Sequence, residues 1–110
     1  MDLTNAYFLS EYKKASILQI DISKLTNFST KALSLADLRK EFQTKQIDDM
    51  IMNIFNSVSL SSPIVIKFPD GTHLFCTEYM TLCLCKVLKI KPSVALINLP
   101  KNYKELNLKA

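Results

Sequence analysis

The 110-residue sequence has one glycine and one histidine, and both scarcities exclude whole classes of site. Glycine-rich loops that hold phosphate groups need several glycines at fixed spacing, so Gly71 alone excludes a P-loop and a dinucleotide-binding fingerprint. A single imidazole, that of His73, excludes metal sites built from several histidines and leaves a catalytic triad only one candidate base. The sequence therefore offers little of what phosphate-binding and metal-dependent enzymes use.

Long apolar runs are also missing. No apolar stretch approaches the roughly 18 residues that a membrane-spanning helix needs, so we expect no membrane insertion. The opening segment MDLTNAYFLSEYKK is acidic before it is basic and contains no long apolar stretch, unlike a secretory signal. The three cysteines form no recognisable disulfide framework, and together these features lead us to expect a cytoplasmic protein.

Arginine is nearly absent from a chain that is otherwise rich in positive charge. Lysine and arginine total 14 against 10 aspartate and glutamate, a formal net charge of +4, and Arg39 is the only arginine. Lysine lacks the planar fork with which arginine grips phosphate and guanine. The charge is compatible with a polyanionic partner, but we favour the ordinary alternative of lysines on solvated helix faces.

The first half of the chain contains one strand pattern and two helix patterns. Alternating apolar residues predict a half-buried strand over Ile17–Ile22. Ser34, followed three residues later by Asp37, resembles a capping box and opens a short predicted helix. A helical apolar period predicts a second helix over Thr44–Val58, with Asp48 and Asp49 in its first turn, where carboxylates suit the helix dipole.

The second half has the pattern strand, turn, strand, helix, strand. We predict strands at 64–68, 74–76 and 94–99, the last of them central, and a helix at 77–89. Gly71 follows Pro69 and Asp70, where a tight hairpin is expected to need a positive φ. The helical spacing predicts one core-facing side and an exposed Leu82; the core-facing residues are Met80, Cys83, Leu84, Val87 and Leu88.

These elements predict a single α/β (α+β) domain with a small mixed sheet of about four strands and three to four helices. Residues 1–15 are predicted to form an N-terminal helical extension, residues 16–99 the domain, and residues 100–110 a lysine-bearing tail.

Several phrases, in order, resemble the ParB-like fold of chromosome-partition proteins, related small nucleases and sulfiredoxin. Members typically begin with a strand ending in I-x-I-S-K-L, and this chain has IDISKL at 20–25. They continue with a helix leading into a strand of the type P-I-V-V, then a hairpin often turning at Asp-Gly; this chain has SSPIVI at 61–66 and Asp70-Gly71. A last strand of the type I-x-P-V-x-I is matched by IKPSVALINL. The resemblance covers about three quarters of the chain.

The departure from that family lies where its functional residues would be. The resemblance implies a Gly-x-His-Arg or Gly-Glu-Arg-Arg box at the start of the helix after the hairpin, binding phosphate, nucleotide or substrate. That chemistry needs a glycine, helix N-terminal amides and a cationic side chain. This chain has no such box there, and its own residues would form at most a degenerate pocket: His73, Cys76, Thr77, Glu78 and Tyr79. Glu78 is better interpreted as a carboxylate that stabilises its own helix.

The other reactive groups were weighed as metal ligands, thiols and acid/base pairs. The spacing H-x₂-C-x₆-C-x-C, from His73 to Cys85, is not a usual zinc framework, so we expect no metal site. Cys76 lies near a helix N-terminus, where the dipole lowers a thiol pKa, but a buried inert cysteine is favoured. No carboxylate pair suits acid/base work. We therefore predict no catalytic residue and no cofactor.

Five lysines near the C-terminus form a candidate nucleic-acid strip, with Tyr103 available for stacking: Lys86, Lys89, Lys91, Lys101 and Lys104. Lysines at a helix C-terminus also complement its dipole, which is the interpretation we favour.

Two functional hypotheses remain open. The first is a non-catalytic regulatory module that binds a protein partner; because members of the broad ParB-like family occur on mobile elements and some inhibit transfer machinery, the resemblance implies an inhibitor or accessory factor of a plasmid or mobile-element system. The second is a DNA-associated protein, of the partition or transcription type, that uses the lysine strip. A nuclease or thiol reductase is the third and weakest interpretation. The sequence identifies neither the partner nor an oligomeric state.

Overall fold

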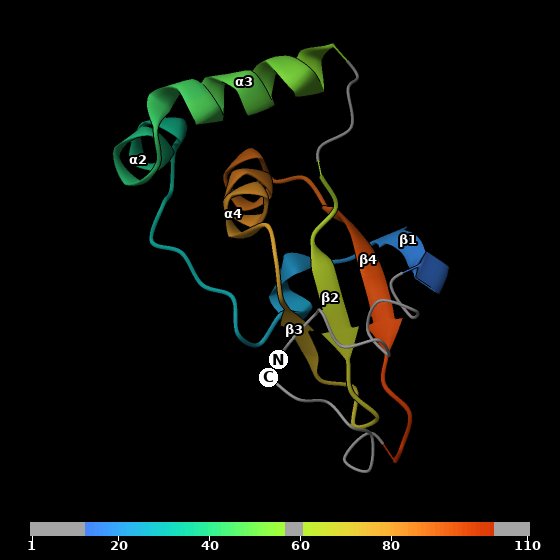
Figure 1. Ribbon diagram of the computed structural model, residues 1–110. Coiled ribbons are helices and arrows are strands. Elements are labelled where there is room, and N and C mark those ends of the chain that lie inside the picture. Colours follow the sequence, from blue (N-terminus) through green and yellow to red (C-terminus); the bar gives the residue numbers. More distant parts are fainter. Residues whose placement is uncertain (1–12, 57–60, 103–110) are drawn as a thin grey trace.

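The computed structural model describes residues 13–56 and 61–102, and their path is shown in Figure 1. In chain order the elements are β1 (Ser16–Gln19), the short 3₁₀ helix η1 (Ile22–Lys24), α2 (Leu35–Glu41), α3 (Thr44–Phe55), β2 (Ile64–Lys67), β3 (His73–Phe75), α4 (Tyr79–Leu88) and β4 (Ser93–Asn98). The predicted class, a mixed α/β fold with a small four-stranded sheet, is confirmed. The predicted N-terminal helix and tail lie largely outside the described residues; Lys13 and Lys14 are helical.

The sheet has the order β1-β4-β2-β3, which places β4 in the interior as predicted. β4 pairs antiparallel with β1 and parallel with β2, and β2 pairs antiparallel with β3. The parallel register aligns Val65 with Leu96, and the hairpin register aligns Val65 with Phe75. β4 can be almost wholly apolar because it has a neighbour on each side and packing on both faces.

The β2–β3 hairpin turns as the sequence predicts. Gly71 has φ +92°, a conformation that an L side chain rarely adopts. Asp70 stabilises the same turn, because its Oδ1 accepts a hydrogen bond of 2.8 Å from the backbone N–H of Thr72. The turn aims β3 back along β2 and delivers the chain to the start of α4.

Helix α4 lies between the sheet and the pair formed by α2 and α3 (Figure 1). Leu82 packs on the sheet with Val65 and Val94. On the other side of the helix, Cys83 and Leu84 pack against the α2–α3 layer. The prediction of an exposed Leu82 is therefore wrong: the rule that a surface helix buries one side fails for a helix covered on two.

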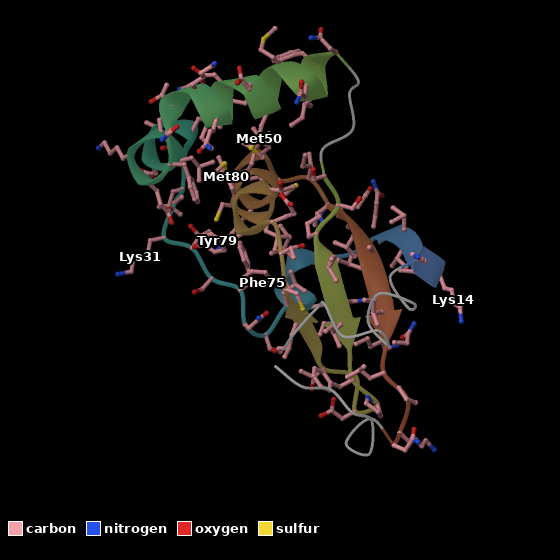
Figure 2. The ribbon with its side chains drawn as sticks, viewed as in Figure 1. Lys14, Lys31, Met50, Phe75, Tyr79 and Met80 are labelled. Carbon is pink, nitrogen blue, oxygen red and sulfur yellow. The ribbon has the colours of Figure 1, made fainter. Side chains whose placement is uncertain are left out.

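Met50 of α3 and Met80 of α4 belong to the apolar cluster between α4 and the α2–α3 layer (Figure 2).

The α2–α3 layer is fixed by its caps and one ion pair. The Ser34 Oγ accepts a 3.2 Å hydrogen bond from the N–H of Asp37, and Asp37 reaches back to the N–H of Leu33 at 2.8 Å, so the predicted cap is confirmed. Because α3 begins at Thr44, Asp48 lies in its second turn rather than the expected first turn. Its carboxylate instead binds Arg39 of α2 at 2.8 Å.

The strand β1 is shorter than predicted. It ends at Gln19, whereas the sequence pattern runs to Ile22. Asp21 is the physical reason, because its Oδ1 accepts a hydrogen bond of 2.9 Å from the N–H of Ser23 and so caps η1. Ile20 is buried as expected, but Leu18 is exposed and Ile22 half-buried.

The outer edge of β3 is covered by the segment after η1. Leu25 forms a parallel bridge with His73, and the N–H of Thr26 donates to the His73 carbonyl at 3.1 Å. The Asn27 side chain then imitates a neighbouring strand: its Nδ2 donates to the Phe75 carbonyl at 3.0 Å and its Oδ1 accepts from the Phe75 N–H at 2.9 Å. Covering an edge in this way protects it from pairing with another chain.

Candidate functional site

The start of α4, where the family resemblance implies a phosphate site, is filled by aromatic rings. Tyr79 stacks on Phe75 with ring centroids 5.9 Å apart, and Figure 2 shows the two side chains together. Phe28 packs against both rings, at 5.7 Å from Tyr79 and 5.9 Å from Phe75. The Tyr79 hydroxyl donates to the Ser29 carbonyl at 3.0 Å, which fixes the ring over this end of the helix. An apolar cluster therefore occupies the space that an anion would need.

Thr77 and Glu78 lead into the helix without forming a site around its N-terminus. The Thr77 Oγ1 accepts a 3.0 Å hydrogen bond from the N–H of Ile64 and so ties the chain to β2. Glu78 has a left-handed backbone, with φ 65° and ψ 46°, and its exposed side chain forms no capping hydrogen bond. The carboxylate thus lies immediately before the first turn, where it is near the positive end of the dipole.

His73 and Cys76 have other contacts than this cluster. Nδ1 of His73 lies 2.7 Å from the Gly71 carbonyl within the hairpin, an arrangement that requires an N–H at that nitrogen. Cys76 packs on the opposite face of the sheet, beside Ile66 and Ile97. Burial raises the pKa of the Cys76 thiol, opposite to the lowering expected of a thiol activated by a helix dipole.

The five residues of the candidate degenerate pocket are thus spread over two faces of the sheet and the hairpin. None of the five lines the hollow between η1 and the end of α4 or the hollow beside α2. The structure brings Tyr79 into an aromatic cluster and leaves the others apart.

The lysine strip is divided by the fold. Lys86, Lys89 and Lys91 gather at the C-terminal end of α4 and the approach to β4. Lys101 follows β4 and so lies at the other end of that strand. Lys104 and Tyr103 lie outside the described residues. Three of the five lysines therefore share one site, and the described part forms no continuous strip.

These three lysines stand at the rim of the larger hollow, a cavity of about 490 Å³ that we call the lysine-rimmed pocket. One wall comes from η1 and the residues that flank it, and the other from the last turn of α4 and the residues after it. Apart from the lysines, the lining residues are Asp21, Ile22, Ser23, Leu25, Phe28, Cys85 and Ile90. The smaller hollow, of about 250 Å³ near the N-terminal turn of α2, carries both charge signs: its titratable lining residues are Lys31, Asp37, Lys40 and Glu41.

Sequence reasoning found the cationic rim of the lysine-rimmed pocket and missed its floor. Lys86 and Lys89 are three apart, so their proximity follows from helical spacing. Leu25 and Phe28 come from the other end of the domain, and no local pattern connects them with α4. Asp21 was treated only as an outward-facing strand residue.

Reactive side chains are few in the part of the chain that the structure describes. No group of three or more histidine, cysteine, aspartate or glutamate residues there could hold a metal ion. Cys83 and Cys85 are buried on different sides of α4, and burial raises the pKa of the Cys85 thiol to about 11. No helix of the described residues has both the length and the apolar character to cross a membrane.

Comparison of the chain with protein-family models, with curated proteins and with solved structures found no match, so the resemblance to the ParB-like family stays a prediction from the sequence.

Proposed function

We propose that this chain is a non-catalytic regulatory module that binds a protein partner. The observation that carries the proposal is the apolar last turn of α3, which the domain leaves uncovered. Met52, Ile54 and Phe55 are 55%, 37% and 79% exposed. Large apolar side chains that cluster on a surface are typical of protein interaction sites.

The exposed turn extends from a well-anchored helix. Ile47 is fully buried near the start of α3, and Asp48 binds Arg39 of α2. Met50 and Ile51 are the last α3 side chains packed on the core, and the helix then continues past α4 (Figure 1). Met52 and Phe55 are three residues apart and so are neighbours on the helix surface. A rigid helix end of this kind suits docking, because little order has to be gained on binding.

The energetic scale is sufficient for a specific contact. Complete burial of a phenylalanine or methionine side chain contributes about 1.5–3 kcal/mol, and Phe55 is the most exposed of the three. Aromatic residues and methionine are also enriched in interface cores. A partner that covers this turn would gain the largest single share of its apolar contact energy from Phe55.

The test compares Phe55→Asp with Leu33→Asp, a matched control at an apolar residue that is 85% exposed but lies before α2. Each tagged protein captures partners from cells of the native host, and each captured candidate is then purified and titrated by calorimetry. We expect a partner that binds the wild type and Leu33→Asp equally and binds Phe55→Asp at least tenfold more weakly. Equal affinity for all three proteins, or the absence of any direct binder, would contradict the proposal.

The narrower role, an inhibitor or accessory factor of a plasmid or mobile-element system, rests on the ParB-like resemblance alone. The genes adjacent to this one provide its test, because a regulator of that kind is expected beside transfer or partition genes.

A DNA-associated function is the alternative proposal. Lys86, Lys89 and Lys91 support it, since they lie together and no acidic residue among those the structure describes is within salt-bridge distance of them. It predicts DNA binding that weakens steeply with salt and is lost when the three lysines become glutamate. Absence of DNA binding at low salt would exclude it.

A further inference from the structure

We infer that the lysine-rimmed pocket binds a small amphipathic anion: an apolar chain or ring that ends in one carboxylate, sulfonate or phosphate. The inference is independent of the proposed partner surface on α3. It rests on the shape, the floor and the rim of the pocket.

The size and depth of the pocket suit a small molecule. Its volume of about 490 Å³ lies within the range typical of small-ligand sites. It is formed by two walls that are far apart in the sequence, η1 with the segment to Phe28 on one side and the end of α4 on the other. A concave site of this kind can surround a compact ligand on several sides.

The floor is apolar and held in place. Leu25 and Cys85 are buried, and Phe28 is fixed by ring contacts with Phe75 and Tyr79. Leu25 is also part of the bridge to His73 that covers the edge of β3. An apolar ligand chain or ring that packs against these side chains would be removed from contact with water, and the floor would not have to rearrange.

The rim has an excess of positive charge. Three lysines and one aspartate among the lining residues give a formal charge of +2. The hydrogen bond from the N–H of Ser23 and, less strongly, the charge of Lys91 lower the pKa of the Asp21 carboxyl. Lys86 Nζ lies 3.5 Å from the Thr30 carbonyl, a long contact. The ammonium group of Lys89 forms no hydrogen bond or ion pair with any described residue. The rim therefore keeps a net positive charge that can attract an anionic group.

The backbone at Lys89 gives a second reason to connect the rim with binding. Lys89 has φ 58°, and its N–H and that of Ile90 return to carbonyls of the last turn of α4. This is the helix-ending position at which glycine is the usual residue. A lysine kept in a conformation that is unfavourable for it is consistent with a role for its side chain.

The same geometry favours a small anion over a nucleic acid. A duplex presents phosphates in a long regular array, and proteins contact several of them along an extended surface. Here the three cations lie along one wall of a single hollow, and Lys101 lies at the opposite end of β4. The apolar floor offers no polar contacts to a phosphate backbone, whereas it can pack against the apolar tail of an amphipathic anion.

The experiment is an NMR titration of the full chain with decanoate, kept below its micellar concentration, and with decanol as the uncharged control. We expect saturable shifts at Ser23, Phe28 and Ile90 with decanoate, and at least tenfold weaker binding of decanol. Replacing Lys89 and Lys91 together by glutamine is expected to weaken decanoate binding by tenfold or more. Lys40→Gln, at the smaller hollow, is the control and is expected to bind as the wild type does.

Several outcomes would overturn the inference. These are an absence of saturable shifts at the pocket, equal binding of decanol and decanoate, or equal binding by the double variant and the wild type. Shifts confined to the last turn of α3 would show an unspecific apolar contact and would also overturn it. The Phe55→Asp variant is expected to bind decanoate normally, so failure of the pocket and failure of the partner surface can be distinguished.

Discussion

The C-terminal end of α4 allows the effect of a glycine substitution on stability to be predicted in both sign and size. Lys89 has a left-handed backbone at the end of the helix, with φ 58°. Lys86, one turn earlier, has the same side chain but lies inside the helix. Replacing each by glycine deletes the same atoms from two different backbone conformations. We expect Lys89→Gly to stabilise the protein and Lys86→Gly to destabilise it.

The magnitudes follow from the backbone. A left-handed conformation raises the free energy of the folded state by about 1–2 kcal/mol for an L residue, and glycine avoids this cost. Glycine also stabilises the unfolded chain by roughly 0.4–1 kcal/mol through its greater conformational freedom, which offsets part of the gain. The net gain for Lys89→Gly is therefore about 0.5–1 kcal/mol. Within a helix glycine is about 0.8–1.0 kcal/mol worse than alanine, and lysine is nearly as good as alanine, so Lys86→Gly loses somewhat less than 1 kcal/mol.

Thermal unfolding followed by circular dichroism measures both effects. For a chain of 110 residues, 1 kcal/mol corresponds to roughly 4 °C in Tm. We expect Tm to rise by about 2–4 °C for Lys89→Gly and to fall by about 2–4 °C for Lys86→Gly. Urea titration gives the same comparison at 25 °C. A lower Tm for Lys89→Gly, or changes of the same sign at both lysines, would refute the reasoning.

Three further predictions concern other parts of the fold. Asn27→Ala removes both hydrogen bonds to the Phe75 backbone, so we expect the free energy of unfolding in urea to fall by about 1–2 kcal/mol and association in sedimentation to increase with concentration. Stability and association equal to those of the wild type would contradict this. The hydrogen bond from the Leu33 N–H lowers the pKa of the Asp37 carboxyl in the folded protein. The ionised Asp37 therefore stabilises the fold above its ordinary pKa of 3.8, and this stability is lost as the pH falls through the pKa of the folded state. Asp37→Asn should flatten the pH dependence of urea unfolding below about pH 4. Burial raises the pKa of the Cys85 thiol to about 11, so at pH 8 it should react with a disulfide reagent far more slowly than the half-buried Cys76, and equal rates would disprove that.

The features predicted well from the sequence are those that local chemistry determines. Gly71 marks the hairpin because few other residues accept its φ, and Ser34 marks a helix start because its hydroxyl satisfies a free N–H. The continuous apolar run of β4 identified an interior strand, because only a strand with neighbours on both sides can be apolar throughout.

The predictions that were wrong concern residues that contact a group outside the local sequence pattern from which they were predicted. The sequence pattern places Leu82 on the surface, yet five consecutive buried residues, Thr81 to Cys85, show that α4 is covered on two sides. Asp21 caps η1 and so ends a strand that the alternation of isoleucines continues. Asp48 binds Arg39 of the neighbouring helix instead of its own helix N-terminus.

The candidate site shows the same division between local and distant information. Helical spacing brings Lys86 and Lys89 together, so the cationic rim could be predicted. The floor depends on Leu25 and Phe28, from the first third of the chain, which lie beside α4 because β1 pairs with β4 and the segment after η1 pairs with β3. In the sequence the five lysines follow one another closely and so suggest one strip. In the fold β4 separates Lys101 from Lys86, Lys89 and Lys91.

The position of the pocket at the end of α4 determines how strongly its anion binding must depend on charge. The C-terminus of a helix carries about −0.5 of an elementary charge, which repels an anion, whereas the family site expected at the other end of α4 would have been helped by its dipole. The formal +2 of the lining residues exceeds this repulsion, but removing two lysines leaves no net positive charge. Neutralising Lys89 and Lys91 together should therefore abolish the preference for decanoate over decanol rather than merely weaken it. Because the rim is exposed, salt should reduce the same preference progressively between about 0.01 and 0.15 M, as the Debye length shortens from about 30 to 8 Å. A preference that survives both changes would have to come from hydrogen bonds to the backbone and not from the lysines.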